Sequence, residues 1–182
     1  WSNKDFRLLF SAQTVSMAGS RITDIAFPLL VLWLTGSPAQ AGIVGALATL
    51  PFAVLGLPAG AWVDRLDRKK VMVWCDLARF VVLISIPIAF WFDVLSLPHI
   101  YLVAILQGCL EVFYTLAEVS SIVSIVPNEH LSGATSKSAA LDGATELIGQ
   151  PVGGFLFGVV GKAVPFLMDA FSFLISAFLI ST

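Results

Sequence analysis

The stretch Gly60-Ala61-Trp62-Val63-Asp64-Arg65-Leu66-Asp67-Arg68-Lys69-Lys70 decides how the chain is organised, because it places six charged residues between two long apolar segments. The hydrocarbon core of a bilayer is about 30 Å thick, and a helix needs about 20 mostly apolar residues to cross it. The segments on both sides of the stretch reach that length. We therefore interpret the stretch as a short connection at the membrane surface between two spanning helices.

The composition places the whole chain among integral membrane proteins. Hydrophobic residues make up 58% of the sequence and charged residues only 12%, against about 25% charged residues in a typical soluble domain. Turns and polar residues divide the chain into six apolar runs, and none shows the polar–apolar alternation of a membrane barrel. We expect an all-α polytopic fold with six transmembrane helices. The expected helices cover about residues 8–34, 39–63, 71–92, 100–126, 137–160 and 163–182.

Basic residues are concentrated on one side of the expected membrane. That side carries Lys4, Arg7, Arg65, Arg68, Lys69, Lys70 and Lys137, and the opposite side carries Lys162. By the positive-inside rule, this bias predicts a multi-pass protein of the cell membrane, plasma or bacterial inner, with a cytoplasmic N-terminus. The sequence has no basic surface tract of the kind that binds nucleic acid, so we expect no nucleic-acid partner.

Reactive side chains do not form a recognisable catalytic or metal-binding pattern. Cys75 and Cys109 lie in expected spans without a CxxC or His-rich partner, so we interpret them as small buried side chains. The sequence also lacks a nucleophile–base constellation and a phosphate-binding loop. We expect no enzyme activity, no catalytic residue, no metal and no cofactor.

The charged stretch resembles the loop between helices two and three of the major facilitator superfamily, and more narrowly of its macrolide-efflux-like branch of drug:proton antiporters. Further stretches that carry this resemblance are Ser37-Pro38, Leu50-Pro51-Phe52, Pro58-Ala59-Gly60, Asp76-Leu77-Ala78-Arg79, Val126-Pro127-Asn128-Glu129-His130-Leu131 and Asp169-Ala170-Phe171-Ser172-Phe173. The resemblance covers essentially the whole chain. It implies the N-terminal six-helix half of a twelve-helix transporter, so we expect a missing C-terminal six-helix half as a partner.

The resemblance also implies a cytoplasmic gate, in which the carboxylate of Asp64 and the basic residues after it contact the partner half. The gate motif comprises Gly60, Asp64, Arg65, Asp67, Arg68 and Lys69. The wider superfamily usually has Gly at the position of Asp67. The alternative is that these charges only anchor a cytoplasmic loop.

The fifth expected helix contains a second motif. Its residues are Gly149, Pro151, Gly153 and Gly154. They resemble an antiporter motif whose core reads Gly-Pro-x-x-Gly-Gly, although Gln150 stands at the proline position and Pro151 follows it. Glycines permit close helix packing and proline removes a helix hydrogen bond, so we expect a kink or a sliding surface. Ordinary small-residue packing is the alternative.

Acidic residues within the expected spans are candidates for proton coupling or for lining a cavity. They are Glu111, Glu118, Asp142 and Glu146. Glu111 and Glu118 share one helix face with Tyr114 and Thr115. An ionised side chain in hydrocarbon costs about 2.5–3.5 kcal/mol, so we expect these acids to face a cavity or to be protonated. Structural ion pairs are the alternative.

Other charged residues form an expected ion-pair network. Arg21 and Asp24, and likewise Asp76 and Arg79, are three residues apart and therefore lie on one helix face. We expect Arg21 to pair with Asp24, with contact to a substrate as the alternative. We expect Asp76 and Arg79 to extend the gate network of Asp64. Many proton-coupled relatives carry a fourth-helix arginine where this chain has Ala104, so a proton relay built on that arginine is not expected.

The expected function is secondary active transport, with proton-coupled efflux of lipophilic drug-like compounds by alternating access. The expected partners are a small lipophilic substrate, protons and the lipid bilayer. One alternative is export of a specific metabolite or siderophore by the same fold. A second alternative, from another class, is a non-transporting membrane scaffold or assembly module.

Overall fold

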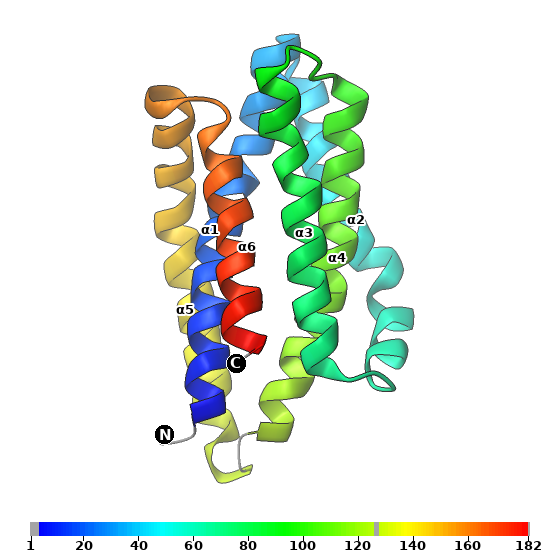
Figure 1. The fold of residues 1–182 in the computed structure, drawn as a ribbon, viewed down its shortest axis with the longest axis vertical. Helices are drawn as coiled ribbons and strands as arrows, with labels where there is room; N and C mark the ends of the chain where they lie inside the picture. The colour runs from blue at the N-terminus through cyan, green and yellow to red at the C-terminus, as the bar shows by residue number, and fades with distance from the viewer. Residues whose placement is uncertain (1–3, 126–127, 182) are drawn as a thin grey trace.

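The computed structural model describes residues 4–125 and 128–181, which form a bundle of long helices (Figure 1). The elements are α1 (Lys4–Thr35), α2 (Pro38–Val63), α3 (Arg68–Trp91), α4 (Leu97–Ile125), α5 (Asn128–Phe155), the π-helical segment η1 (Leu156–Val160) and α6 (Val164–Ser181). Strands are absent from the described residues. The expected all-α fold with six helices is confirmed.

The helix ends extend beyond the apolar runs in several places. α3 begins at Arg68 instead of near residue 71, and α5 begins at Asn128 instead of near residue 137. Hydrophobicity marks only the part of a helix that lies in hydrocarbon, whereas backbone hydrogen bonding continues through polar residues at the membrane surface. The charged connection between α2 and α3 is correspondingly short.

Local capping determines where the first helices end and begin. α1 stops at Gly36, whose φ of 65° is left-handed and whose N–H donates to the Leu32 carbonyl at 2.8 Å, as at many helix C-termini. The Ser37 hydroxyl caps α2 by accepting from the Gln40 N–H, and Pro38 occupies the first turn. The Asp67 carboxylate caps α3 by accepting from the Lys70 N–H at 3.3 Å.

The packing of the helices leaves α4 and α5 largely apart. α6 packs against both α1 and α3, and α4 packs against both α2 and α3. α5 packs mainly against α1 and touches α4 only weakly, although α4 and α5 are consecutive in the chain. Figure 1 shows α5 beside α1 on one side of the bundle, with α2 and α4 on the other.

Two apolar clusters form the core. In one, the rings of Phe27 and Phe166 meet edge to face with centroids 5.1 Å apart. The other contains Met72, Tyr114 and Ile180. Buried polar side chains accompany these clusters: Gln13, Ser16, Thr23, Asp76, Arg79, Gln107, Glu118, Ser121, Asp169, Ser172 and Ser176. Buried polar groups are costly in a structural core, so these side chains indicate where a functional site lies.

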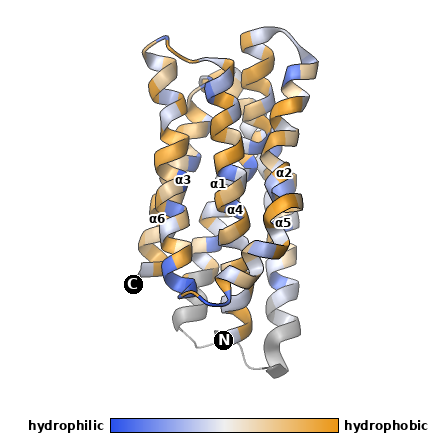
Figure 2. Ribbon diagram, turned by 90° about the vertical axis from the view of Figure 1, so that its right-hand side faces the viewer, coloured by the Kyte–Doolittle hydropathy of each residue, from blue (hydrophilic) through white to orange (hydrophobic). Residues whose placement is uncertain are grey.

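The surface of the bundle suits a lipid environment. Among the described residues, α1, α2, α3, α4 and α6 are long and apolar enough to cross a membrane. α5 lacks a sufficiently apolar window because Gly and polar residues interrupt it. Figure 2 shows apolar residues along most of the bundle, with hydrophilic residues gathered towards its lower end. The chain is a multi-pass membrane protein.

Candidate functional site: a charged cavity between α1, α4 and α5

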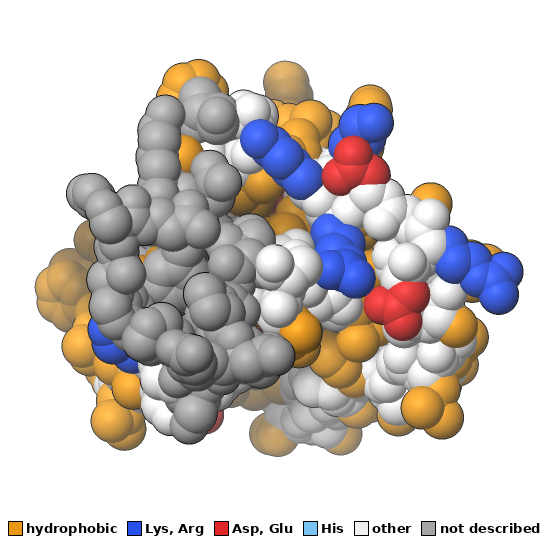
Figure 3. Space-filling view, turned by 90° about the horizontal axis from the view of Figure 1, so that it is seen from below, with side chains coloured by type: hydrophobic (Ala, Val, Ile, Leu, Met, Phe, Trp, Pro, Cys, Tyr) orange, Lys and Arg blue, Asp and Glu red, His pale blue; other side chains and the backbone are white. Residues whose placement is uncertain are grey.

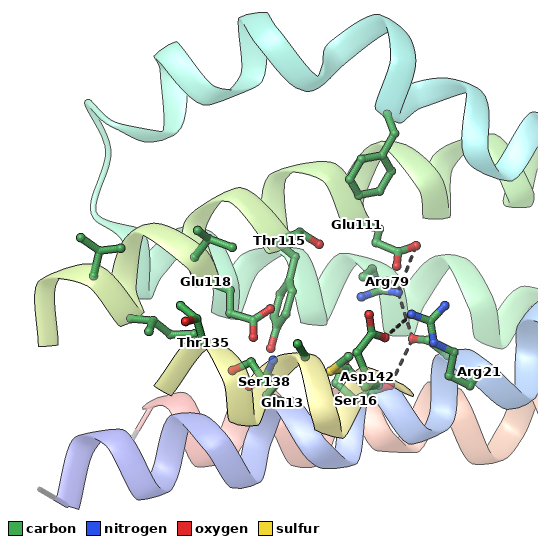
Figure 4. Close-up of a pocket in the computed structure, with 18 residues that line it drawn as sticks. Gln13, Ser16, Arg21, Arg79, Glu111, Thr115, Glu118, Thr135, Ser138 and Asp142 are labelled. Atoms are coloured by element: carbon green, nitrogen blue, oxygen red, sulfur yellow. Dashed lines mark hydrogen bonds and ion pairs between the residues drawn. The ribbon is translucent and has the colours of Figure 1, made fainter. Parts of the chain in front are cut away.

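A cavity of about 430 Å³ lies where α4 and α5 are separated, and residues of α1 and α3 also line it (Figure 4). Its polar lining comes from Gln13, Ser16, Ser20 and Arg21 of α1, Arg79 of α3, Glu111, Tyr114, Thr115 and Glu118 of α4, and Thr135, Ser138 and Asp142 of α5. The four α4 residues occupy the single face that their spacing predicts. Apolar side chains, including Phe52 and Met17, complete the wall.

An ion-pair cluster joins α1 to α5 at one end of this cavity. The Arg21 guanidinium donates to Asp24 at 3.2 Å, the partner expected from their spacing. It also donates to Asp142 of α5, which the sequence did not indicate (Figure 4). Arg21 therefore neutralises part of the acidic charge in the cavity and ties the two helices together.

Arg79 is the buried centre of the polar layer. Its guanidinium donates to the Gln107 amide oxygen at 3.3 Å and to the Ser20 hydroxyl at 3.2 Å. A carboxylate oxygen of Glu111 lies 3.9 Å away, and the Phe173 ring centroid lies 4.1 Å from the guanidinium carbon. One cation thus links α1, α3, α4 and α6.

The predicted link of Asp76 and Arg79 to the gate residue Asp64 is wrong. No ion pair or hydrogen bond joins Asp76 or Arg79 to Asp64 in the described part of the chain. Both side chains are buried, whereas Asp64 is exposed at the end of α2. Arg79 points into the bundle because its hydrogen-bond partners, Ser20 of α1 and Gln107 of α4, lie there. Arg79 bonds to Gln107, which follows Ala104 by one helical turn.

The four candidate acids have different environments. Glu111 and Asp142 are partly exposed to the cavity, and each has an arginine beside it. Glu118 is only 7% exposed, and its Oε1 atom has no protein hydrogen-bond partner. Glu146 is exposed and lies outside the cavity lining. The cavity therefore brings together three of the four acids.

The gate motif lies on the lower face of the bundle, where Figure 3 shows basic and acidic side chains side by side. Arg68 reaches from α3 to the Ser120 carbonyl of α4 at 2.9 Å. The Lys70 backbone N–H, bonded to Asp67, holds the pKa of that carboxyl below its usual range. Asp64 makes no ion pair within the described residues, and no atom lies within 4 Å of a Cβ built at Gly60. The chain itself leaves both positions open.

The opposite end of the bundle has a different character. There the ammonium of Lys162 lies 4.6 Å from the centre of the Trp33 ring, an amphipathic contact of the kind found at membrane interfaces. The side chains of Lys4 and Arg7, used to predict orientation, lie outside the described residues. The described basic residues at the lower end are compatible with the predicted asymmetry.

The glycines of α5 divide into two groups. A Cβ at Gly149 would lie 2.5 Å from the Arg21 Cβ, and one at Gly153 would lie 2.5 Å from the Ile22 carbonyl oxygen. A Cβ at Gly154 would meet no atom within 4 Å. α5 stays helical through Pro151 and becomes π-helical at η1, a local widening often found at functional sites. Close packing on α1 is thus one role of the motif.

Sequence reasoning missed the central position of Arg79 and the complete burial of Asp76. A weak signal was available, because two charged residues in an otherwise apolar helix must find polar neighbours. The sequence could not indicate which neighbours. Over residues 4–125 and 128–181, no group of three metal-ligating side chains comes together.

Comparison with known proteins gives one consistent result. Residues 9–182 match the Major Facilitator Superfamily. The chain is 26% identical to the uncharacterized MFS-type transporter YkuC of Bacillus subtilis over 99% of its own length and 42% of that protein. It is 31% identical to the multidrug efflux pump Tap of Mycolicibacterium fortuitum over 85% of its length and 39% of that protein. It is 28% identical to macrolide efflux protein A of Streptococcus pyogenes over 87% and 39%. The chain thus spans about two fifths of each of these relatives.

Proposed function

Because this chain belongs to the major facilitator superfamily, we propose that it forms the N-terminal six-helix half of a secondary active transporter. This transporter exports lipophilic drug-like compounds by alternating access and takes up protons in exchange. It resides in the cell membrane with the N-terminus in the cytoplasm. Similarity to a multidrug efflux pump and to a macrolide efflux protein supports the direction and the substrate class.

The cavity between α4 and α5 is the observation that carries the proposal. Polar groups from four helices, α1, α3, α4 and α5, converge there while the outer surface stays apolar. Polar residues are expensive in a membrane and are kept where a solute or ion must pass. Phe52 and Met17 give the wall an apolar share that suits a lipophilic substrate.

The acidic lining supports proton exchange. Glu111, Glu118 and Asp142 surround a cavity in which Arg21 and Arg79 are the cations. A proton on Asp142 would weaken its bond to Arg21 and so loosen α5 from α1. Protonation and movement of a helix are thereby linked through one contact.

The open gate residues support a partner half. Asp64 and Arg65 are exposed, and Gly60 has free space beside it, so a C-terminal bundle can approach this face closely. Charges of both signs would then close the cytoplasmic side by pairing across the two halves.

The test is transport of a fluorescent lipophilic cation by the full-length protein in proteoliposomes under an imposed pH gradient. Asp142→Asn should weaken the dependence of transport on the gradient. Glu146→Gln is the matched control, because Glu146 lies one turn away and outside the cavity lining. It should weaken the dependence of transport on the gradient less than Asp142→Asn does. Transport that ignores the gradient in the unmodified protein would overturn proton coupling. Competition by structurally unrelated compounds separates a drug exporter from a metabolite exporter.

A further inference from the structure

A second group of polar side chains lies behind the cavity wall, where α3, α4 and α6 meet. Asp76 of α3 and Ser176 of α6 are completely buried, and Tyr114 of α4 is 4% exposed. The Ser176 hydroxyl lies near both the Asp76 carboxylate and the Tyr114 hydroxyl, although neither pair has the geometry of a normal hydrogen bond. Glu118, one turn after Tyr114, is close enough to Asp76 for the two carboxylates to repel.

These groups share an unusual lack of well-formed bonds. Both oxygens of Asp76, the hydroxyls of Tyr114 and Ser176, and Oε1 of Glu118 have no protein hydrogen-bond partner of normal geometry. Buried polar atoms are nearly always hydrogen-bonded in folded proteins. Several unpaired polar atoms close together therefore indicate a binding site for a proton, an ion or another small ligand.

The charges around Asp76 indicate what that ligand is. Arg79 lies one helical turn after Asp76 on α3 but forms no ion pair with it. The Arg79 guanidinium instead points to Ser20, Gln107 and Glu111. The remaining titratable neighbours are the thiol of Cys75 on α3, with Tyr114 and Glu118 on α4; α6 contributes the neutral Ser176. Two neighbouring carboxylates, one completely buried and the other nearly so, cannot both stay ionised at low cost.

We propose that Asp76 is a proton-binding residue of the transport cycle, and that Glu118 passes protons between it and the cavity. This inference rests on the proposed function and adds a site that the cavity acids do not include. In the conformation described, Asp76 is a neutral carboxylic acid, whose O–H can donate to a carboxylate or hydroxyl oxygen beside it. Tyr114 and Ser176 supply hydroxyls that rotate to suit either state.

The position of Glu118 supports its role in the pathway. Glu118 and Tyr114 line the cavity, whereas Asp76 and Ser176 do not. A hydronium ion in the cavity would transfer a proton to a carboxylate oxygen of Glu118 and leave a neutral water molecule. It would then leave Glu118 as a new O–H bond forms on Asp76, restoring the Glu118 carboxylate. Reversal of these steps returns the proton to the cavity, and no other reactant is needed.

Infrared spectroscopy of the full-length protein in lipid nanodiscs tests the site without transport. At neutral pH, the unmodified protein should show the carbonyl band of a protonated carboxylic acid, and Asp76→Asn should lose it. Asp169→Asn is the matched control, because Asp169 is also a buried aspartate but accepts a bond from Ser172 at 3.2 Å; it should retain the Asp76 band. A spectrum of Asp76→Asn that matches the unmodified protein would overturn the proposal.

Exchange into heavy water gives a second readout, which does not depend on Asp76→Asn folding. Deuterium should reach the Asp76 acid more slowly in Glu118→Gln than in Glu111→Gln, since Glu111 lies on the same face two turns earlier and has Arg79 as its charged neighbour. Equal rates would exclude Glu118 as the proton carrier. If adding sodium ions at constant pH removed the band, the site would bind a metal cation and the proton assignment would be wrong.

Transport distinguishes a coupling proton from a structural one. Asp76→Asn should flatten the pH profile of export by the full-length protein, whereas loss of a structural proton would lower stability and leave the profile in place. The two proposals fail separately. Gradient-driven export without the infrared band would refute the Asp76 site alone, and the band without gradient-driven export would refute the proposed function.

Discussion

Replacing Gly153 with alanine tests how closely α5 packs on α1. A Cβ at this position would lie 2.5 Å from the Ile22 carbonyl oxygen and 2.7 Å from Ile25 Cγ2. Ordinary C···O contacts start at about 3.3 Å, so the helices must separate by about 0.8 Å at this point. The nearer contact is a backbone atom, which cannot rotate away. Overpacking of this kind costs about 1–3 kcal/mol.

Gly154→Ala is the matched control, because the same methyl group added one residue later meets no atom within 4 Å. Both variants gain the same helix propensity, about 1 kcal/mol, so their difference isolates the contact with α1. At about 2–4 °C per kcal/mol for a chain of this size, Gly153→Ala should melt about 2–12 °C below Gly154→Ala. Thermal unfolding of the purified chain in detergent, followed by circular dichroism, measures this difference. A Gly153→Ala protein that melts at or above the control would refute the packing described here.

Two further predictions concern the gate region. Asp64→Asn should slow transport by the full-length protein while leaving insertion and helix content unchanged, because it removes the charge offered to the partner half; transport at the unmodified rate would show that Asp64 does not act as a gate. The lowered pKa of Asp67 means that its cap stabilises α3 above the ordinary aspartate pKa and is lost as pH falls through the lower folded value. Hydrogen exchange in the first turn of α3, corrected for the intrinsic rate, should therefore rise only in acid. Asp67→Asn, which keeps a capping oxygen but cannot titrate, should abolish that pH dependence.

The sequence predicts the helices well because span length and turn chemistry are local properties. Gly36, Ser37 and Pro38 end one helix and begin the next through their own backbone preferences. The start of α5 was less predictable, since the polar residues before residue 137 continue a helix outside the hydrocarbon. Hydrophobicity carries no information about such extensions.

Charged residues show where local reasoning stops. Arg21 pairs with Asp24 at the expected spacing, but Arg79, which has the same spacing from Asp76, bonds to α1 and α4. Spacing tells which groups can meet on one helix, and neighbouring helices decide whether they do. The contact of Arg21 with Asp142 and the isolation of Asp76 both depend on helices far away in the sequence.

Simultaneous measurement of proton and substrate movement tests the central claim most directly. Proteoliposomes containing the full-length protein, a pH-sensitive dye inside and a fluorescent lipophilic cation as substrate would report both fluxes in one sample. The account predicts that protons move in the direction opposite to the substrate, in a fixed ratio, and that Asp142→Asn reduces this coupling. Substrate movement with no accompanying proton movement, from a correctly folded protein, would contradict it.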